Sequence, residues 1–296
     1  MACYLRQTLQ VSRIATDDET LQLAALRRVA GIITALDMEL TPPENSVAVY
    51  EAIADITGCR DPYLNLKEQS NRAALAMLPE CEKKIAGSAD PLMTALRFAI
   101  GGNIIDYGAM HSFDVDAAME GCLKSTFSLD HSAELLQKLH GLGKNGRILY
   151  LADNSGEIVY DSLVIRELVD MGLSVTVAVK SGPIINDALR ADAGVCGLQE
   201  IARVIENGTC CPGTPLQSCS QELQQEFYEA DLIISKGQGN FETLSETDVE
   251  IFFLLTIKCS VVGAHLAQIS GTPEDALSGA GELVLYHHRG NKQSHA

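Results

Sequence analysis

The sequence predicts an α/β protein with a helical first half and a mostly parallel sheet in its second half. Apolar residues recur at near-helical spacing up to about residue 130, whereas strand-like and helix-like segments alternate afterwards. Such alternation is typical of βαβ units. The chain has 296 residues, of which 46% are hydrophobic, so a sizeable core is expected. We therefore expect a helical domain over 1–130 and an α/β domain over 131–296.

Turn residues divide the first half into helices. Apolar residues from Leu21 to Leu36 keep a helical period, and the turn residues Thr41-Pro42-Pro43 end that element. The further helices expected before residue 130 cover 47–57, 63–78, 91–105 and 116–126.

After residue 130 the pattern changes to short apolar runs with turn residues between them. The expected elements are a helix over 133–142, a strand over 147–152, a helix over 158–171, and strands over 174–179, 201–205 and 231–235. The apolar stretch from Phe252 to Cys259 is interpreted as a buried helix. Further short strands are expected near Val261-Val262 and Val284-Leu285.

Composition argues against several classes of partner. The formal net charge of −17 repels nucleic-acid phosphates, and we find no basic patch that would offset it. No apolar run approaches the roughly 20 residues that span a bilayer, and the N-terminus lacks a secretory pattern. The nine cysteines include no CxxC pair, so we expect reduced thiols in a cytoplasmic protein, with Cys210-Cys211 in a loop.

Oxygen-bearing side chains follow two of the predicted strands. Asp153-Asn154 comes directly after strand 147–152, and Asn186-Asp187 follows strand 174–179. The carboxyl ends of parallel strands converge on one crevice, where Asp153, Asn154 and Asp187 would supply three oxygens to a hard divalent cation. The alternative is that these residues form turns, or that Asn186 caps the next helix.

A lysine followed by glycines comes after a third strand. In Lys236-Gly237-Gln238-Gly239-Asn240 the glycines allow backbone N–H groups to approach an anion, and the lysine adds positive charge. The segment matches neither a Walker loop nor a dinucleotide fingerprint, which makes nucleotide binding an unfavoured interpretation.

Other polar residues are weaker candidates for the same crevice. Asn103 and Asp106 lie about one helical turn apart, and Lys258 interrupts an apolar segment. Glu157 is a candidate general base or an ordinary residue of a helix N-terminus. Each also has a structural interpretation, because lysine stems extend over apolar surface and polar residues end helices.

Several of these segments together resemble one family. LADNSGE, SGPIINDA, DLIISKGQGNFETLSE and FFLLTIKC occur in that order, with CYLRQ, DPY and GGNIID upstream. They are similar to motifs of the damage-control phosphatases, first catalogued as domain of unknown function 89, and in particular of the stand-alone KGQGN-type subfamily. The likeness runs over nearly the whole chain. The single cysteine of CYLRQ departs from the CxxC pair expected in relatives.

The resemblance implies an N-terminal helical bundle packed on a Rossmann-like α/β/α sandwich, and a metal-dependent phosphatase acting on small phosphorylated metabolites. Asp153, Asn154 and Asp187 match the metal-binding positions of the family. Lys236 matches the phosphate-contacting lysine of the family's KGQGN motif, and Lys258 matches a later lysine of the family. Such enzymes accept Mg²⁺, Mn²⁺, Co²⁺ or Ni²⁺, so the resemblance leaves the ion open.

Our leading hypothesis is hydrolysis of a phosphomonoester such as a sugar phosphate or a phosphopantetheine compound, with Asp153, Asn154, Asp187 and Lys236 as the catalytic set. The expected substrate-binding set is Asn103, Asp106, Ser155, Glu157, Gly237, Gly239, Asn240 and Lys258. Water is favoured over Asp153 as nucleophile, since Ser155 stands where a dehalogenase-type phosphatase has a second aspartate. The rival hypotheses are an S-adenosylmethionine-dependent carboxyl methyltransferase and a non-catalytic phosphometabolite-binding protein.

Overall fold

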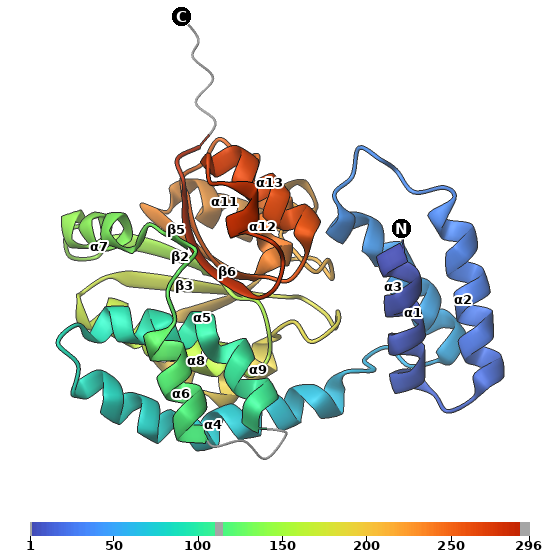
Figure 1. Ribbon diagram of the computed structural model, residues 1–296, viewed down its shortest axis with the longest axis horizontal. Coiled ribbons are helices and arrows are strands. Elements are labelled where there is room, and N and C mark those ends of the chain that lie inside the picture. The colour runs from blue at the N-terminus through green and yellow to red at the C-terminus, as the bar shows by residue number, and fades with distance from the viewer. Residues whose placement is uncertain (1, 110–114, 291–296) are drawn as a thin grey trace, which may run out of the picture.

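The structure is a computed structural model that describes residues 2–109 and 115–290, with the side chains of 103–109, 115–119 and 274 outside the description. A seven-stranded sheet lies at its centre, with helices on both faces (Figure 1). The strands are β1 (Leu129–Asp130), β2 (Arg147–Leu151), β3 (Ser174–Val179), β4 (Arg203–Glu206), β5 (Leu232–Lys236), β6 (Ile251–Ile257) and β7 (Glu282–His288). The predicted α/β class with a mostly parallel sheet is confirmed.

In the strand order β1-β7-β6-β5-β2-β3-β4, the order in which strands are added to the sheet reverses at β2, in the middle of the sheet. From β2 the chain proceeds outwards through β3 and β4, and then returns to the other side of β2 as β5 and β6. All five of these strands are parallel, whereas β7 is antiparallel to β6. The carboxyl ends of β2 and β5 therefore flank a topological switch point, where open α/β sheets bind their ligands.

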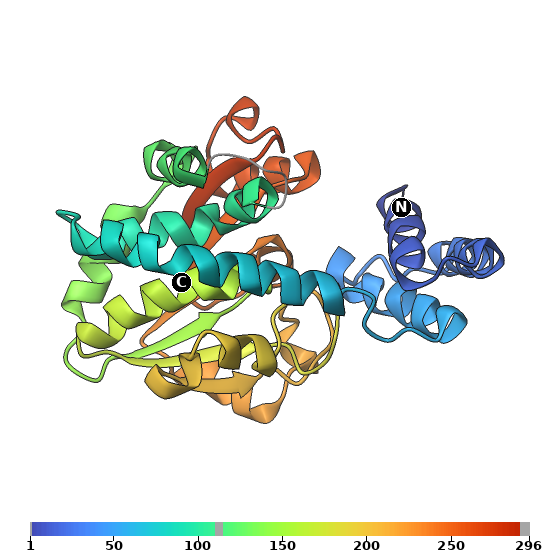
Figure 2. The ribbon, with the colours of Figure 1, turned by 90° about the horizontal axis from the view of Figure 1, so that it is seen from below.

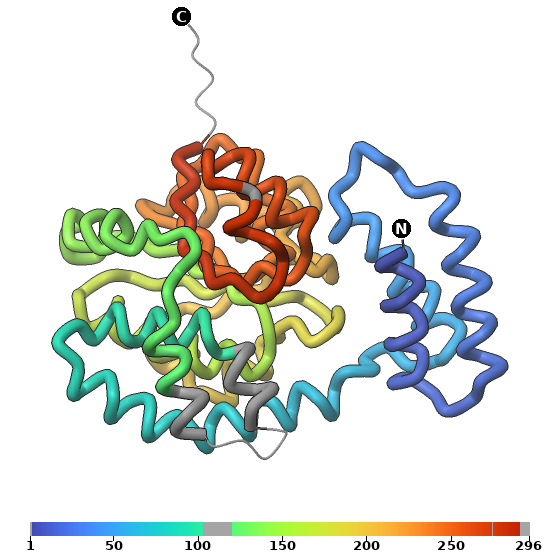
Figure 3. Tube along the Cα trace, viewed as in Figure 1, coloured from blue at the N-terminus to red at the C-terminus, as the bar shows by residue number. Residues whose placement is uncertain are grey.

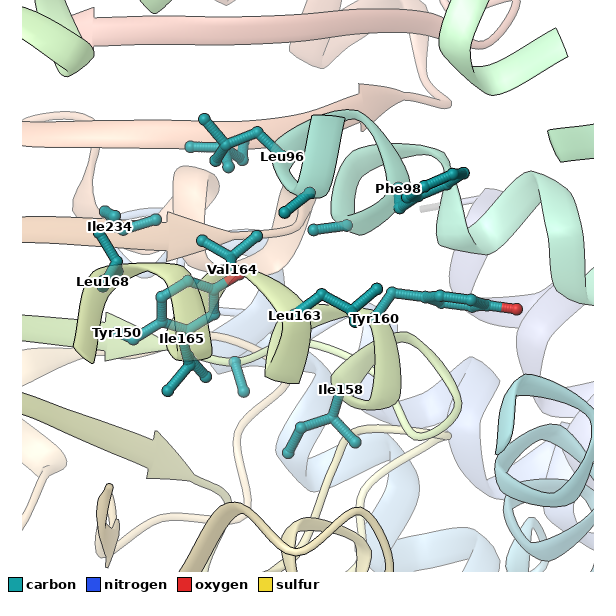
Figure 4. Packing of buried hydrophobic residues seen from close by; sticks show 14 of the residues in the cluster. Leu96, Phe98, Tyr150, Ile158, Tyr160, Leu163, Val164, Ile165, Leu168 and Ile234 are labelled. Carbon is teal, nitrogen blue, oxygen red and sulfur yellow. The ribbon is translucent and has the colours of Figure 1, made fainter. Parts of the chain in front are cut away.

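Two hydrophobic clusters cover the two faces of the sheet. One face packs against α5 (Pro91–Ala109) and α8 (Glu157–Asp170), and the other against α11 (Gln221–Glu229), α12 (Gln238–Leu244) and α13 (Ser260–Ser270). Helix α8 is buried on almost every side, because it packs against the sheet, α5 and helix α4 (Leu64–Ala86), and its apolar side chains lie among those of α5 and the sheet (Figure 4). The remaining helices of the α/β part are α6 (Val115–Lys124), α7 (Ser132–Gly141), α9 (Arg190–Val195), α10 (Leu198–Ile201) and the 3₁₀ turns η1 (Leu216–Ser218) and η2 (Glu274–Ala276).

The first three helices form a bundle with its own core. Helices α1 (Ala2–Ala15), α2 (Glu19–Ile33) and α3 (Pro42–Thr57) enclose a small cluster of buried residues: Val11, Ala25, Val29, Val49, Ala52 and Ile53. The bundle stands beside the sandwich and joins it through residues 58–63 (Figure 3). Helix α4 (Leu64–Ala86) then runs from the bundle across the α5–α8 face (Figure 2).

The helices predicted for 1–130 thus divide between two hydrophobic cores. Helices α4 and α5 share the cluster of the sandwich, and β1 joins the sheet through β7. The boundary at residue 130 stays a prediction, because the packing shows no break there. None of the helices in the described part of the chain is long and apolar enough to span a membrane.

Two expected elements are wrong. The apolar run from Phe252 to Cys259 is not a helix, because Ile251–Ile257 forms the buried strand β6. Val261-Val262 lies in helix α13 and belongs to no further strand, whereas Val284-Leu285 does lie in a strand, β7. Asn186 does not cap a helix, since α9 begins only at Arg190 and has Leu189 as its N-cap.

Candidate functional site

The ends of β2 and β5 meet closely at the switch point. Gly237, the residue after β5, has φ 82°, a left-handed value that favours glycine. A Cβ atom placed on Gly237 would lie 2.0 Å from Oδ2 of Asp153, which follows β2. The backbone of Gly237 therefore packs directly against the Asp153 carboxylate, and only glycine leaves room for it.

The segment after β3 lies against the segment after β2. We call residues 152–156 the first loop and residues 180–189 the second loop. Asn154 and Asp187 form an isolated antiparallel bridge. The Ser155 N–H donates to Asn186 O at 2.9 Å, and the Ala188 N–H donates to Asp153 O at 2.8 Å. The structure thus brings the two predicted Asp/Asn pairs together.

The second loop carries an unusual backbone conformation beside the site. Ile185 has φ 43°, which is rare for a β-branched residue. Such conformations persist only where the surrounding structure enforces them. Here the hydrogen bonds between the loops, together with the Asp187 N–H donating to Ile184 O at 3.0 Å, hold the turn that presents Asp187.

Three carboxylates gather where the loops meet. Asp187 and Glu157 are buried and Asp153 is half-buried. The Asn154 amide donates to Asp153 Oδ2 at 2.6 Å and to Glu157 Oε2 at 3.1 Å. Burial raises the pKa of Asp153 well above its ordinary value, and the nearby Glu157 and Asp187 raise it further. Burial also raises the pKa of Asp187 to about 6, against the opposing effect of Lys180. A cation would relieve this concentration of negative charge.

Lys236 lies beneath these carboxylates and is fully buried. Its ammonium group donates to Ala99 O at 2.9 Å, to Glu157 Oε1 at 2.6 Å and to Asp161 Oδ1 at 2.6 Å. Burial lowers the pKa of a lysine, but the Asp161 and Glu157 carboxylates outweigh it and raise the pKa of Lys236. The three N–H donors of Lys236 are thus all used inside the protein.

Two other residues that we predicted for the site from the KGQGN segment, Gly239 and Asn240, have structural contacts. A Cβ on Gly239 would lie 2.0 Å from Pro212 O, so this glycine allows the 208–214 loop to approach α12. The buried Asn240 amide donates to Lys236 O at 2.9 Å and accepts from the Thr214 hydroxyl at 2.7 Å. Both residues therefore fix the loops around the site.

The remaining predicted residues differ in position. Ser155 is 2% exposed, and its hydroxyl has no hydrogen-bond partner within the described structure. Lys258 is exposed and follows β6, at the same sheet edge as Asp153. Asn103 and Asp106 belong to α5, but their side chains lie outside the described residues.

Three residues near the site were not singled out from the sequence. Lys180 is 3% exposed, lies 3.6 Å from Asp187 Oδ2, and donates to Gly213 O. Lys67 and Asn71 lie on α4 and are 3% and 4% exposed. The signal for the α4 pair is positional: both continue the buried stripe of α4 that Ala74, Cys81 and Ile85 form. A polar residue on the core-facing stripe of a helix indicates a buried polar partner.

The donor set suits a hard divalent cation. Asp153, Asn154 and Asp187 offer carboxylate and amide oxygens, and the two loops that carry them are joined by the Asn154–Asp187 bridge. Mg²⁺ and Mn²⁺ prefer such ligands, and Mg²⁺ retains several waters. Within the described residues no three side chains of the His, Cys, Asp and Glu types form a metal-binding group. The fit therefore rests on two carboxylates and an amide.

The chain is similar to known proteins along almost its full length. Residues 1–271 match the damage-control phosphatase ARMT1-like domain. A damage-control phosphatase of Pyrococcus horikoshii is 34% identical over 275 residues, covering 90% of this chain and 92% of that protein. One from Archaeoglobus fulgidus is 31% identical over 269 residues, covering 90% and 93%. The crystal structure of a DUF89 family protein from P. horikoshii superposes with a TM-score of 0.85 at 31% identity, covering 97% of this chain and 96% of that one.

Proposed function

The chain belongs to the family of the damage-control phosphatase ARMT1-like domain, and on that premise we propose that it is a divalent-metal-dependent phosphatase of small phosphorylated metabolites. The observation that carries this proposal is the meeting of the Asp153-Asn154 and Asp187 loops at the switch point of the sheet. Three buried or half-buried acids there create a demand for positive charge that a metal ion would meet.

Asp153, Asn154 and Asp187 would hold the ion. When bound, such an ion neutralises charge on a phosphoryl group and lowers the pKa of coordinated water. The protein supplies the fixed geometry: the bridge between Asn154 and Asp187 joins the two loops in their middle, and Gly237 leaves room for the Asp153 carboxylate. Mg²⁺, Mn²⁺, Co²⁺ and Ni²⁺ are the candidates to test.

Positive side chains at the same sheet edge would bind the phosphoryl oxygens. Lys180 and Lys258 follow β3 and β6 and lie close enough to lower the pKa of Asp153, against the burial that raises it. Lys236 contributes differently: with its donors used by Glu157, Asp161 and Ala99, it keeps Glu157 in place beside Asn154. The catalytic role of Lys236 in this proposal is therefore indirect.

Water is the proposed nucleophile. A carboxylate that ligates a metal is less free to attack, and Asp153 already packs against Gly237. Glu157 remains the candidate base, because its carboxylate contacts the Asn154 amide at the edge of the site. Asn103, Asp106 and Ser155, whose hydroxyl has no hydrogen-bond partner among the described residues, complete the proposed substrate contacts. The proposed substrate is a sugar phosphate or a phosphopantetheine-like ester. Because its nine cysteines are all free thiols, we place the protein in the cytoplasm.

The test is phosphate release from p-nitrophenyl phosphate, a panel of sugar phosphates and 4′-phosphopantetheine, with each divalent metal and with EDTA. We expect metal-dependent turnover that Asp153→Asn and Asp187→Asn reduce to the metal-free background. Asp170→Asn, which removes one exposed carboxylate of α8, is the matched control and should retain full activity. Turnover that survives EDTA or Asp153→Asn would sink the proposal.

The two rival functions have their own readouts in the same preparation. Transfer of a methyl group from S-adenosylmethionine to a carboxylate would favour the methyltransferase; against it, the first loop holds Gly156 as its single glycine. Tight binding of a phosphorylated metabolite without turnover under any metal would favour the non-catalytic protein.

A further inference from the structure

Asn71 of α4 connects the two loops of the site from outside. Its side-chain oxygen accepts from the Gly156 N–H at 2.7 Å, at the end of the first loop. Its amide nitrogen donates to Asp192 Oδ1 at 2.6 Å. The other oxygen of Asp192 accepts from the N–H of Leu189, at the end of the second loop, at 2.8 Å. One helix thus contacts both loops through a chain of three hydrogen bonds.

We infer that Asn71 and Asp192 form a positioning pair that sets the spacing between the loops carrying Asp153 and Asp187. This inference rests on the proposed function, because it assigns the pair a purpose at that site. Neither residue is itself a proposed metal ligand. The pair acts through backbone N–H groups, three residues beyond Asp153 in one loop and two beyond Asp187 in the other.

Burial makes the pair specific for its present chemistry. Asn71 is 4% exposed and Asp192 is 7% exposed, so water cannot replace a lost partner cheaply. Asparagine supplies the acceptor for Gly156 and the donor for Asp192 at once, and aspartate supplies two acceptors. Alanine at either position would leave a buried N–H or carboxylate without its hydrogen-bond partner, which is costly where water cannot replace it.

The direct contacts between the loops do not fix this spacing alone. They join residues 153–155 to 186–188 in the middle of the loops, whereas the pair holds Gly156 and Leu189, where the loops lead into α8 and α9. Gly156 is the N-cap residue of α8 and has φ 76°, a conformation that glycine adopts readily, and Asn71 supplies the hydrogen-bond acceptor for its N–H. Orientation of ligands by outer residues is worth about 10–100-fold in metal affinity.

The two residues can be exchanged without losing a hydrogen bond. In the Asn71→Asp/Asp192→Asn double variant, the residue 71 carboxylate accepts from both the Gly156 N–H and the new amide at 192. The amide oxygen at 192 accepts from the Leu189 N–H. Either single substitution places like groups together instead: two carboxylates in Asn71→Asp, and two amide nitrogens in Asp192→Asn. Cys81→Ala is the control, since it loosens the packing of α4 about three turns away from the pair.

We would measure Mn²⁺ affinity of the full chain by electron paramagnetic resonance, amide exchange of 153–158 and 186–190, and the melting temperature. Each single variant should weaken Mn²⁺ binding at least about tenfold and speed exchange in both loops. The double variant should recover affinity to within about threefold. Cys81→Ala should lower the melting temperature with Mn²⁺ affinity unchanged.

Other outcomes overturn the inference. If the single variants melt earlier yet bind Mn²⁺ like the wild type, the pair only anchors α4 to the rest of the fold and does not position the metal ligands. A double variant that recovers melting temperature but not affinity would show the same. If the wild type binds Mn²⁺ and hydrolyses no phosphate ester, the proposed function fails. The Mn²⁺ affinities of the variants then still test whether Asn71 and Asp192 position the metal ligands. If the wild type binds none of Mn²⁺, Mg²⁺, Co²⁺ and Ni²⁺, the proposed function and the inference both fail.

Discussion

The ends of β2 and β5 can lie this close together because Gly237 has no Cβ atom. Its φ of 82° and the 2.0 Å between a virtual Cβ and Asp153 Oδ2 are separate constraints. A side chain there would be strained and would also push the Asp153 carboxylate from its place. The first effect concerns stability and the second concerns the proposed metal site, so the two can be separated by experiment.

Gly237→Ala should therefore lose metal-dependent phosphatase activity almost completely. Gly271→Ala is the matched control, because Gly271 has φ 73° and nothing lies within 4 Å of its virtual Cβ. A left-handed alanine costs about 1–2 kcal/mol, so Gly271→Ala should lose that much stability in urea unfolding and Gly237→Ala at least that much. The control should keep its activity. Equal activity losses in the two variants would show that the contact with Asp153 is unimportant.

Lys236→Met tests whether the buried lysine stabilises the protein through its ion pairs with Glu157 and Asp161 or binds the substrate phosphate directly. Removing its ammonium takes away the cation that Glu157 and Asp161 share in the interior, and breaking a buried ion pair costs about 3–5 kcal/mol. We expect that loss in the free energy of unfolding by urea. The exposed Lys258→Met should change stability by less than about 0.5 kcal/mol and raise KM for the phosphate ester. A stable but inactive Lys236→Met would instead indicate direct contact with substrate.

The residues found from the sequence and those missed differ in their surroundings. Asp153, Asn154 and Asp187 were singled out because they lie in the segments that follow two apolar strands, a pattern that places them at one sheet edge before any contact is known. Asn71 and Lys180 were missed because their importance lies in partners 121 and 33 residues away along the chain. A pattern of neighbouring residues in the sequence cannot predict contacts between residues so far apart along the chain.

Among the elements, β6 shows where periodicity carries no information. Ile251–Ile257 is apolar at nearly every position, so it has neither the period of a half-buried strand nor that of an amphipathic helix. A central strand with both faces covered has this appearance. The length of the run, seven residues, is the feature that favours a strand. The predicted helices with clear apolar stripes, such as α3 and α4, were recovered.

The start of β7 supports a pH prediction. Glu282 accepts hydrogen bonds from the N–H groups of Ser278, Gly279 and Ala280 and from the Ser278 hydroxyl. Burial alone would raise the pKa of Glu282, but these hydrogen bonds lower it to about 2. A carboxyl whose folded pKa is depressed stabilises the fold above its ordinary pKa, and this contribution disappears as the pH falls from about 4.5 to 2.

Glu282→Gln should therefore melt earlier than the wild type at pH 7. The difference in melting temperature should shrink as the pH falls from about 4.5 towards 2, where the wild-type carboxyl also becomes protonated. Circular dichroism melts at several pH values measure it. Glu39→Gln changes an exposed carboxylate and should follow the wild type throughout. A Glu282→Gln difference that stays constant with pH contradicts the assignment.

At the scale of the whole molecule, the chain has a small separate core beside a large one. The bundle of α1–α3 encloses its own cluster, yet it also borders the site. Tyr50 and Ile53 of α3 and Pro183 and Ile184 of the second loop line one small pocket. Helical periodicity predicted the helices before residue 130 but not how they divide, because the same apolar stripe suits either core. Helices α4 and α5 belong to the larger core because they pack against α8, whereas α1–α3 pack against one another.

Two separate cores predict two levels of stability. Ile53→Ala removes a side chain that is 1% exposed in the bundle core, and such truncations cost about 2–5 kcal/mol. Because the bundle core is small, we expect amide exchange to speed up throughout 2–57 while the sheet keeps its protection. Ile148→Ala, 1% exposed in the sandwich core, is the matched variant and should lower protection in the sheet and in α8 together. If Ile53→Ala instead loosens the sheet to the same degree as the bundle, the two cores unfold as one cooperative unit, and the bundle cannot open independently over the site.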